Sequence, residues 1–415
     1  MEEAQKQART QILLTQFPLS LRELIWIRLI AAIGGGGVIY LTPMVFHQEA
    51  FSASSVTQGL ALAALAGTLG RLLSGALLDR GTNCSIPVLM AVLMFLLADG
   101  HLLSSQTFDD YLLGQVGLGF GLGLYWPAIE LAVPLSCAPL SSANAFALVR
   151  SADALGVATG TLVGAALAAL GWLRGIYPLD MVCLAVVAML LVWKRLPDPK
   201  PQPDLAQPLC WQQWLPPLLP LLLVAIVATA MPALMQSALP LDLVQGGLAR
   251  AAISEGMGAL TIGLQLGLLL LFQWPVGRLL AQRPVASGLI FSLSCFVGGN
   301  LLLAASALVS WGLIPMVAAQ IPLALGTAAF LPTATEAVVQ LSPASRQGVA
   351  MAFYSQCFGI SGFSAPLLAG WLLDSNGHGV LLWLIMAAIC GLSIRLAARI
   401  KPCSAPAIAA SPQPF

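Results

Sequence analysis

The sequence predicts an all-α membrane protein in which twelve transmembrane helices form two pseudo-symmetric bundles of six. Three observations lead to this fold class. Only 8% of the residues are charged, against about 25% in soluble domains, so the chain cannot build a water-soluble surface. Apolar residues come in windows of about 20, the length of helix that crosses a bilayer. Features of the first half also return slightly more than 200 residues later in the second.

Twelve apolar windows, separated by polar residues or by glycine and proline, predict the helices in order. They lie at about 21–43, 56–78, 86–105, 112–135, 144–169, 175–194, 215–240, 252–276, 285–309, 311–335, 348–372 and 379–400. A proline-rich polar stretch follows the sixth window and reads as a linker. The expected domains are a six-helix bundle over 1–194, a cytoplasmic linker over 195–214, a second bundle over 215–402 and a tail over 403–415.

Basic residues predict that both termini are cytoplasmic, since an even number of spans places them on one side of the membrane. That side would carry Lys6, Arg9, Arg80, Lys194, Arg195, Lys200, Arg283, Arg346, Arg399 and Lys401, and the opposite loops would hold Arg174, Arg250, Asp109, Asp110 and Asp242. Residues 1–20 lack the short apolar core of a removable signal peptide, so we expect the first helix to direct membrane insertion.

Composition and spacing argue against several functional classes. The net charge of +1 gives no reason to expect a nucleic-acid partner. The eight cysteines are scattered, so we expect neither a metal site nor a cofactor. The glycines between Gly114 and Gly123 lie inside an apolar span without a preceding strand, which excludes a phosphate loop. No pairing of nucleophile and base, or of two acids, predicts an enzyme.

An internal repeat relates the two halves. Gly75 aligns with Gly277, each after an even-numbered span, and Trp126-Pro127 aligns with Leu331-Pro332. In the same alignment Gly156, the first glycine of a series that continues at positions 160 and 164, falls near Gly359 of the second half. Duplicated six-helix halves are typical of secondary transporters, which bind their substrate at the junction of the halves near the bilayer midplane.

The segment from Gly75 to Arg80 (GALLDR) resembles the start of the G-x-L-A-D-R-x-G-R-K signature of the major facilitator superfamily. The second glycine and the basic pair of that signature would fall on Thr82, Asn83 and Cys84, so the match stops there. The segment from Gln273 to Leu279 (QWPVGRL) resembles the second-half copy. Ala281 and Gln282 then stand where that copy often has Asp-Arg, so only the first half keeps the acid.

Two further segments extend the resemblance over nearly the whole chain. Residues 144–156 are similar to the fifth helix of bacterial members, and residues 365–374 are similar to the end of their eleventh. The resemblance implies a rocker-switch carrier of the bacterial inner membrane, in which helices one, four, seven and ten surround a central cavity. It also suggests the drug-efflux branch of the superfamily. The expected partners are a small-molecule substrate, H⁺ as the coupling ion and the lipid bilayer, and the chain is expected to be a monomer.

The same resemblance suggests gating residues: Gly75, Asp79, Arg80, Arg71, Glu130 and Gly277. The Asp79 carboxylate could lie against the positive N-terminal end of a neighbouring helix, a contact worth about 0.3–1 kcal/mol when exposed. Arg71 and Glu130 both lie near the cytoplasmic ends of their helices. We expect either an ion pair between them or separate contacts of each with the interface.

Charges inside the spans are costly and usually face a partner or a wet cavity. Arg150 and Asp153 are three residues apart, so they share a helix face and could pair. Arg28 should reach a similar depth. We expect a polar cluster of these three side chains, with Asp153 as the candidate proton-binding group; a purely structural ion pair is the alternative.

Uncharged side chains on the expected cavity helices are further candidates for substrate contact: Trp126, Gln265, Gln320, Tyr354 and Gln356. Three functions stay open at this point. Few fixed charges would suit proton-coupled efflux of lipophilic compounds by an antiporter, which we favour. Arg28 and Arg150 would suit uptake of a small anion instead. A transport-inactive relative, acting as a sensor or assembly factor, is the third.

Overall fold

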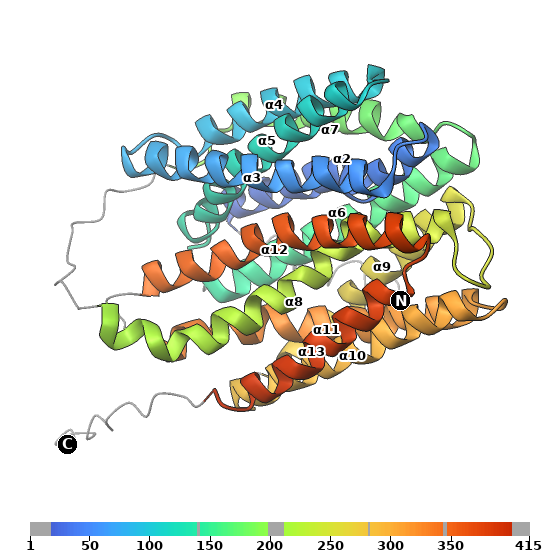
Figure 1. Ribbon diagram of the computed structural model, residues 1–415. Helices are drawn as coiled ribbons and strands as arrows, with labels where there is room; N and C mark the ends of the chain where they lie inside the picture. The colour runs from blue at the N-terminus through green and yellow to red at the C-terminus, as the bar shows by residue number, and fades with distance from the viewer. Residues whose placement is uncertain (1–17, 139–141, 198–210, 281–282, 343–346, 401–415) are drawn as a thin grey trace, which may run out of the picture.

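The computed structural model describes residues 18–138, 142–197, 211–280, 283–342 and 347–400 (Figure 1). Over these ranges the regular structure is helical, and twelve helices are long and apolar enough to cross a membrane. The prediction of an all-α fold with twelve spans is therefore confirmed. The proposed linker lies mostly outside the described residues.

Each apolar window became one helix of 18 to 35 residues. The first half contains α2 (Leu19–Gln48), α3 (Ala53–Asp79), α4 (Ser85–Ser104), α5 (Phe108–Ser136), α6 (Ser142–Ala169) and α7 (Ile176–Trp193), with the short 3₁₀ turn η1 (Leu173–Gly175) before α7. The second half contains α8 (Trp211–Gln245), α9 (Glu255–Leu280), α10 (Val285–Leu308), α11 (Leu313–Leu341), α12 (Gln347–Asn376) and α13 (Val380–Ala397).

Several helices run beyond the windows that predicted them. Helix α8 begins at Trp211, inside the predicted linker, and α11 continues to Leu341. The windows mark the part of a helix that lies in hydrocarbon, whereas a helix can continue through the headgroup layers, where polar side chains are tolerated. For these helices the predicted spans were therefore too short.

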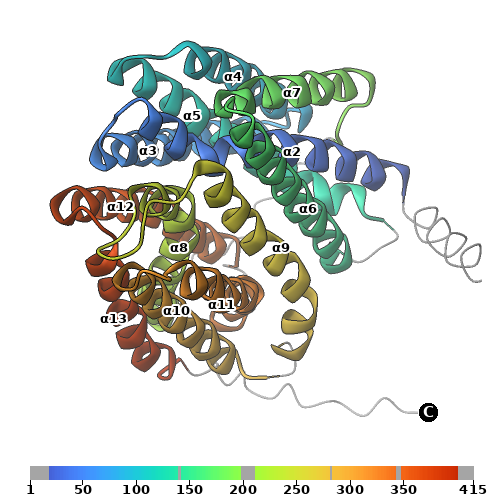
Figure 2. The same cartoon turned by 90° about the vertical axis from the view of Figure 1, so that its right-hand side faces the viewer.

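Each half is a bundle whose helices pack mainly on one another, and the halves meet mainly along three pairs of helices. Figure 2 shows α2 to α7 on one side of this division and α8 to α13 on the other. Across it, α3 packs on α12, α6 packs on α9, and α2 packs on α8. These contacts join the halves without merging their cores, an arrangement that lets one half move against the other.

Glycines on α6 let it lie directly on α2. A Cβ built at Gly160 would be 1.9 Å from Ile33 O, and one at Gly156 would be 2.7 Å from Leu29 O. A Cβ at Gly164 would be 2.3 Å from Leu41 Cδ1. Lipid gives helices little hydrophobic reason to associate, so close van der Waals contact takes over that role. The glycine series of α6 therefore serves close packing of two helices.

Candidate functional site

Four charged side chains of the first half lie together, and we call them the charged cluster: Arg28 of α2, Glu130 of α5, and Arg150 and Asp153 of α6. Arg28 Nε donates to Asp153 Oδ1 at 2.9 Å, and Arg28 Nη2 donates to Glu130 Oε1 at 2.9 Å. Arg28 Nη2 also pairs with Asp153 Oδ2. Arg150 Nη2 lies 3.4 Å from Glu130 Oε1. The cluster has two cations and two anions, so its charges balance.

An indole ring stabilises both guanidinium groups of the cluster. The Cζ atoms of Arg28 and Arg150 lie 5.4 and 5.7 Å from the centre of the Trp126 ring. Tyr125 in turn meets Trp126 edge to face, at 5.4 Å between ring centres. The negative face of an aromatic ring attracts a cation at such distances. Trp126, which precedes Pro127 in the repeat, is thereby part of the site.

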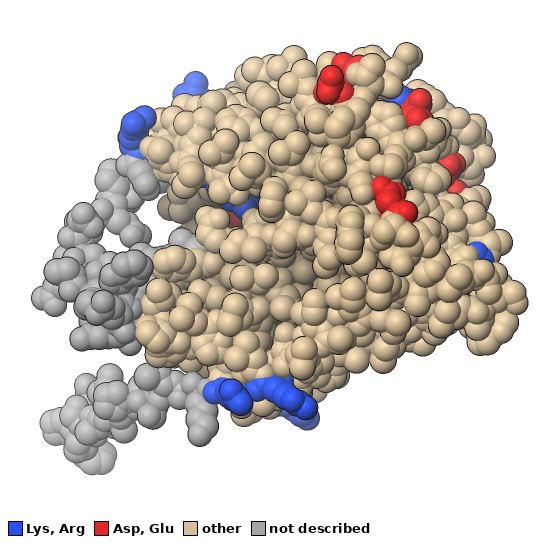
Figure 3. All heavy atoms as spheres, in the orientation of Figure 1, with Lys and Arg blue, Asp and Glu red and all other residues tan. Residues whose placement is uncertain are grey.

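Exposure rises from one end of the cluster to the other. The Arg28 side chain is 0% exposed, Asp153 16%, Glu130 26% and Arg150 49%. Arg28 therefore lies in the dry core, whereas Arg150 meets open space. Figure 3 shows a recess between the two halves with Lys and Arg atoms inside it. The cluster extends from the exposed Arg150 side chain to the buried face of α2.

Two of the expected pairings are wrong for this structure. Arg150 pairs with Glu130 rather than with Asp153, because Arg28 takes both oxygens of the Asp153 carboxylate. The ion-pair partners of Glu130 within the described chain are Arg28 and Arg150, not Arg71. Arg28 approaches Asp153 from another helix and presents Nε and Nη2 to its two oxygens, the bidentate geometry that suits a planar guanidinium.

The remaining uncharged candidates are spread over the second half. Tyr354 lies within electrostatic range of Arg150 and meets Phe358 edge to face, so it borders the cluster. Gln265 of α9 is buried, and Gln320 of α11 donates to Met316 O of its own helix at 2.9 Å. Gln356 is exposed beside Gly359. Thus Trp126 and Tyr354 adjoin the charged cluster, and a substrate role for the three glutamines stays a prediction.

The bundle end that carries the C-terminal ends of α3, α5, α7 and α9, called the linker side, is where the described parts of the two halves leave the recess seen in Figure 3. A Cβ built at Gly75 or at Gly277 would meet no described atom within 4 Å. Arg80 is exposed. The Asp79 side chain lies outside the described part of the structure, so its contact with a helix end stays a prediction.

The opposite end, called the far side, is closed between the halves. The carboxylate of Asp374, at the end of α12, accepts hydrogen bonds from Ala53 N at 2.9 Å and Ser54 N at 2.8 Å, the first amides of α3. A Cβ at Gly370 would lie 1.9 Å from Thr57 Oγ1. A carboxylate on the positive end of a helix is a favourable contact. The structure is therefore accessible from the linker side.

Replacing Asp374 with alanine should loosen the far side. Loss of a helix cap costs about 1 kcal/mol, which corresponds to roughly a five-fold change in an equilibrium between closed and open ends. Alkylation of a Thr57→Cys reporter by a membrane-impermeant maleimide, applied from the far side, should become about five-fold faster. Asp109→Ala, which removes another exposed acid on that side, is the control. Equal rates in all three proteins would show that the Asp374 contact does not hold the halves together.

Sequence reasoning missed several buried charges. Asp99 of α4 and Asp180 of α7 lie inside apolar windows, 0% and 4% exposed, and face each other. Asp242 and Arg250, assigned to a loop, are 0% and 4% exposed. An acid within an apolar window was the available signal for the first two. Among the described residues, no group of three or more His, Cys, Asp or Glu side chains could hold a metal ion.

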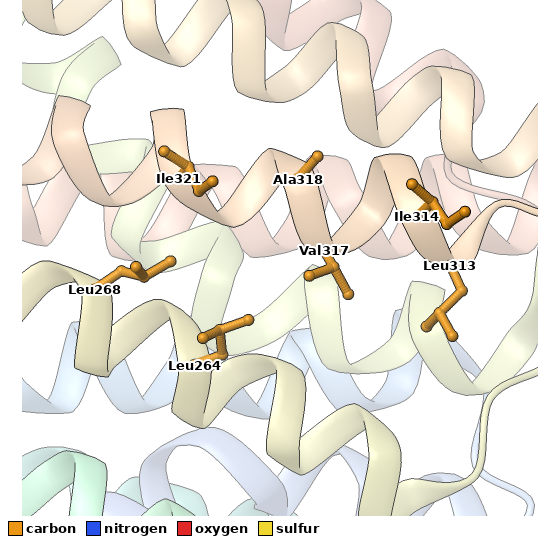
Figure 4. Close-up of a pocket in the computed structure, with 7 residues that line it drawn as sticks. All are labelled: Leu264, Leu268, Leu313, Ile314, Val317, Ala318 and Ile321. Atoms are coloured by element: carbon orange, nitrogen blue, oxygen red, sulfur yellow. The ribbon is translucent and has the colours of Figure 1, made fainter.

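A groove between α9 and α11 is lined only by hydrocarbon. Its residues are Leu264, Leu268, Leu313, Ile314, Val317, Ala318 and Ile321 (Figure 4). Several of them are exposed, as expected for a surface that contacts lipid tails. The groove offers no polar group to orient a solute, so the charged cluster and its recess are the better candidate site.

Comparisons with known proteins agree with this geometry. A family model described as Major Facilitator Superfamily matches residues 24–298, more than half of the chain. No curated protein matched the sequence.

Solved structures match the fold over most of its length. A POT family transporter in complex with 5-aminolevulinic acid has a TM-score of 0.78 at 10% identity, with 91% of this chain and 95% of that chain covered. A mutant of the nucleoside transporter NupG gives 0.76 at 12% identity, covering 92% and 99%. A peptide transporter POT in complex with sulfate gives 0.73 at 13%, covering 92% and 93%. At such identities the likeness is evidence for the fold alone.

Proposed function

The chain belongs to the major facilitator superfamily, a family of membrane transporters, and from this premise we propose that it exports a small lipophilic molecule by proton-coupled alternating access. A second premise comes from topology. The linker side would face the cytoplasm of a bacterial inner membrane, because basic residues gather on that side in the sequence. The cargo would then enter from the side on which this structure is open.

The observation that carries the proposal is one buried arginine shared by two carboxylates. Arg28 holds Asp153 with two contacts and Glu130 with one. A proton on Asp153 would remove the charge from its side of this pair and weaken both charge-assisted contacts. Arg28 would then depend on Glu130 alone. Protonation would thereby weaken the ion pair that holds α2 against α6.

The recess supplies the route for the proton and the cargo. Glu130 and Arg150 form the exposed end of the charged cluster, and Asp153 lies between them and the dry core. A proton can therefore reach Asp153 from the linker side through polar groups. The balanced charges of the cluster leave the recess without a strong net attraction for ions, which suits a lipophilic cargo.

Coupling is tested with Asp153→Asn, which keeps the shape of the side chain and removes its titration. Because the thiolate is the reacting form, the alkylation rate of the Thr57→Cys reporter is divided at each pH by the rate of the same cysteine in denatured protein. In wild-type protein this normalised rate should differ several-fold between acidic and alkaline pH, because protonation shifts the balance between the two open states. The normalised rate in Asp153→Asn should be the same at both pH values. Asp109→Asn is the matched control and should behave as wild type.

Proteoliposomes then test transport itself. Ethidium and dansylglycine, a lipophilic cation and a lipophilic anion, are offered with and without a pH gradient. Wild-type protein should move at least one of them faster with the gradient, and Asp153→Asn should lose that acceleration. Unaltered proton dependence in Asp153→Asn would remove Asp153 from the coupling role, and absence of gradient-driven movement of both dyes would count against proton-coupled efflux of lipophilic compounds.

A further inference from the structure

Arg71 differs from the arginines of the charged cluster because no acid of the described residues pairs with it. It lies on α3, and its Nη1 atom is buried without a hydrogen-bond partner among the described residues. None of the ion pairs of the described chain includes it. Arg71 as a whole is half-buried, but a guanidinium without a counter-charge is costly inside a membrane span and usually serves a substrate or ion pathway there.

The surroundings of Arg71 are formed by one face of α3, from the first half, and one face of α12, from the second half. On α3, Thr68 and Arg71 are three residues apart and point toward α12. On α12, Gln356 and Gly359 have the same spacing. A Cβ built at Gly359 would lie 3.4 Å from Thr68 Oγ1, 3.7 Å from Arg71 Nη1 and 3.7 Å from Gln356 Oε1. Polar atoms therefore converge on a position where the glycine has no side chain.

This position lies at the depth of the charged cluster. Arg71 is eight residues before the linker-side end of α3, and Glu130 is six before the end of α5. At 1.5 Å per residue both are roughly 9–12 Å from that end. Next to Gly359, the Phe358 ring packs edge to face on Tyr354 at 5.6 Å. The Phe358 position is about 100° round α12 from Gly359, so the aromatic surface lies on the flank of the face that meets Arg71.

We propose that Arg71 binds the anionic head of the cargo at the α3–α12 seam, and that the cargo is an amphipathic organic carboxylate whose apolar body lies against the Phe358 side. A guanidinium with free donors matches a carboxylate, and the amide of Gln356 can supply a further donor. Since Arg71 and Gly359 belong to different halves, a carboxylate bound between them contacts both sides of the moving interface.

The inference rests on the proposed transport function, but it is tested by binding. The probes are dansylglycine and its uncharged analogue dansylglycinamide, titrated by fluorescence against the full chain in nanodiscs of zwitterionic lipid. Wild-type protein should bind dansylglycine about ten-fold more tightly than the amide, the usual effect of a charged hydrogen bond. Arg71→Gln should lose that preference and bind both probes alike. Arg278→Gln, which removes an exposed arginine of α9, should bind as wild type.

Two further measurements separate binding from folding. Arg71→Gln should have a Tm no lower than wild type without a probe, because it breaks no contact of the described structure; a clear drop would assign Arg71 a structural role and overturn the proposal. Gly359→Ala adds a methyl group at ordinary contact distance and should weaken dansylglycine binding while the protein stays folded.

Four results would overturn the proposal: no binding of dansylglycine, equal binding of both probes by wild type, unchanged preference in Arg71→Gln, or loss of binding when phosphatidylglycerol is added to the nanodiscs. The last would assign Arg71 to a lipid phosphate. Binding without gradient-driven transport would instead contradict the proposed function and leave the carboxylate site standing.

Discussion

Replacing Arg28 with glutamine is expected to lower the free energy of unfolding by about 3–5 kcal/mol and to abolish gradient-driven transport. Arg28 is fully buried and is the partner of two carboxylates. Removing one member of a buried ion pair leaves an uncompensated charge in the interior, which is why the cost is large. In this cluster two acids would remain, with Arg150 as the partner of Glu130 alone.

The measurement is the Tm of purified protein in detergent, together with dye transport in proteoliposomes. Arg278→Gln is the control, because it removes an arginine that is exposed and should change neither quantity. The double variant Arg28→Gln with Asp153→Asn should regain part of the lost stability, since the second change neutralises one of the stranded acids. Transport should stay absent. A double variant less stable than Arg28→Gln would contradict this account of the cluster.

Comparison with Asp153→Asn separates the structural role of the cluster from its coupling role. That variant leaves Arg28 paired with Glu130, so its Tm should fall less than that of Arg28→Gln. Its response to pH should nevertheless be lost, because the group that titrates is gone. A residue that only holds helices together would show the two losses in proportion. In Asp153→Asn we expect the response to pH to be lost completely while the Tm falls only slightly.

The spans were predictable because the bilayer imposes a length and a composition on every crossing segment. The contact of Gly160 with α2 was also predictable, since close helix packing in lipid needs small residues. The end of α8 was not. Its window stopped near residue 240, whereas the helix continues to Gln245 and takes Asp242 with it. Apolar averages fall at a polar residue even when the backbone hydrogen bonds continue.

Three members of the charged cluster were predictable, but the membership of Glu130 and the pairing were not. An intramembrane charge is visible in the sequence, and its place along the chain gives its depth, which brought Arg28, Arg150 and Asp153 together. Pairing depends on how each helix is rotated and packed. Glu130, expected to pair with Arg71, lies on a face of α5 that meets Arg28. The sequence carried no information on that rotation.

Asp99 and Asp180 show a different limit. Each is one acid within an apolar window, so each was visible as a charge in a span. Their mutual approach joins α4 to α7, which are neighbours in space but not in sequence. A Cβ at Gly34 of α2 would lie 2.1 Å from Asp180 Oδ1, so the same acid also fills the space beside a glycine of the first helix. Such three-helix contacts need the fold.

The second large effect is expected at the far side, where Asp242→Ala should lower the free energy of unfolding by about 3–5 kcal/mol. The Asp242 carboxylate accepts from Gly379 N at 3.0 Å and from Trp383 Nε1 at 3.1 Å, and lies 3.3 Å from Arg250 Nη2. Arg250 also donates to Ser306 Oγ at 2.7 Å. One carboxylate therefore joins α8, the loop before α9, α10 and α13. Without it, a buried guanidinium and two buried donors lose their acceptor.

The Tm of Asp242→Ala is compared with that of Asp110→Ala, an exposed far-side acid 3.7 Å from His101, which should leave the Tm unchanged. Arg250→Ala should cost less than Asp242→Ala, because Asp242 keeps two of its donors. The double variant should then be more stable than the sum of the single losses implies, because it leaves no stranded charge. All of these partners lie in the second half, so the pH dependence of the normalised alkylation rate of the Thr57→Cys reporter should persist in whatever protein stays folded. A Tm for Asp242→Ala equal to that of Asp110→Ala would mean that the carboxylate does not hold these four segments together.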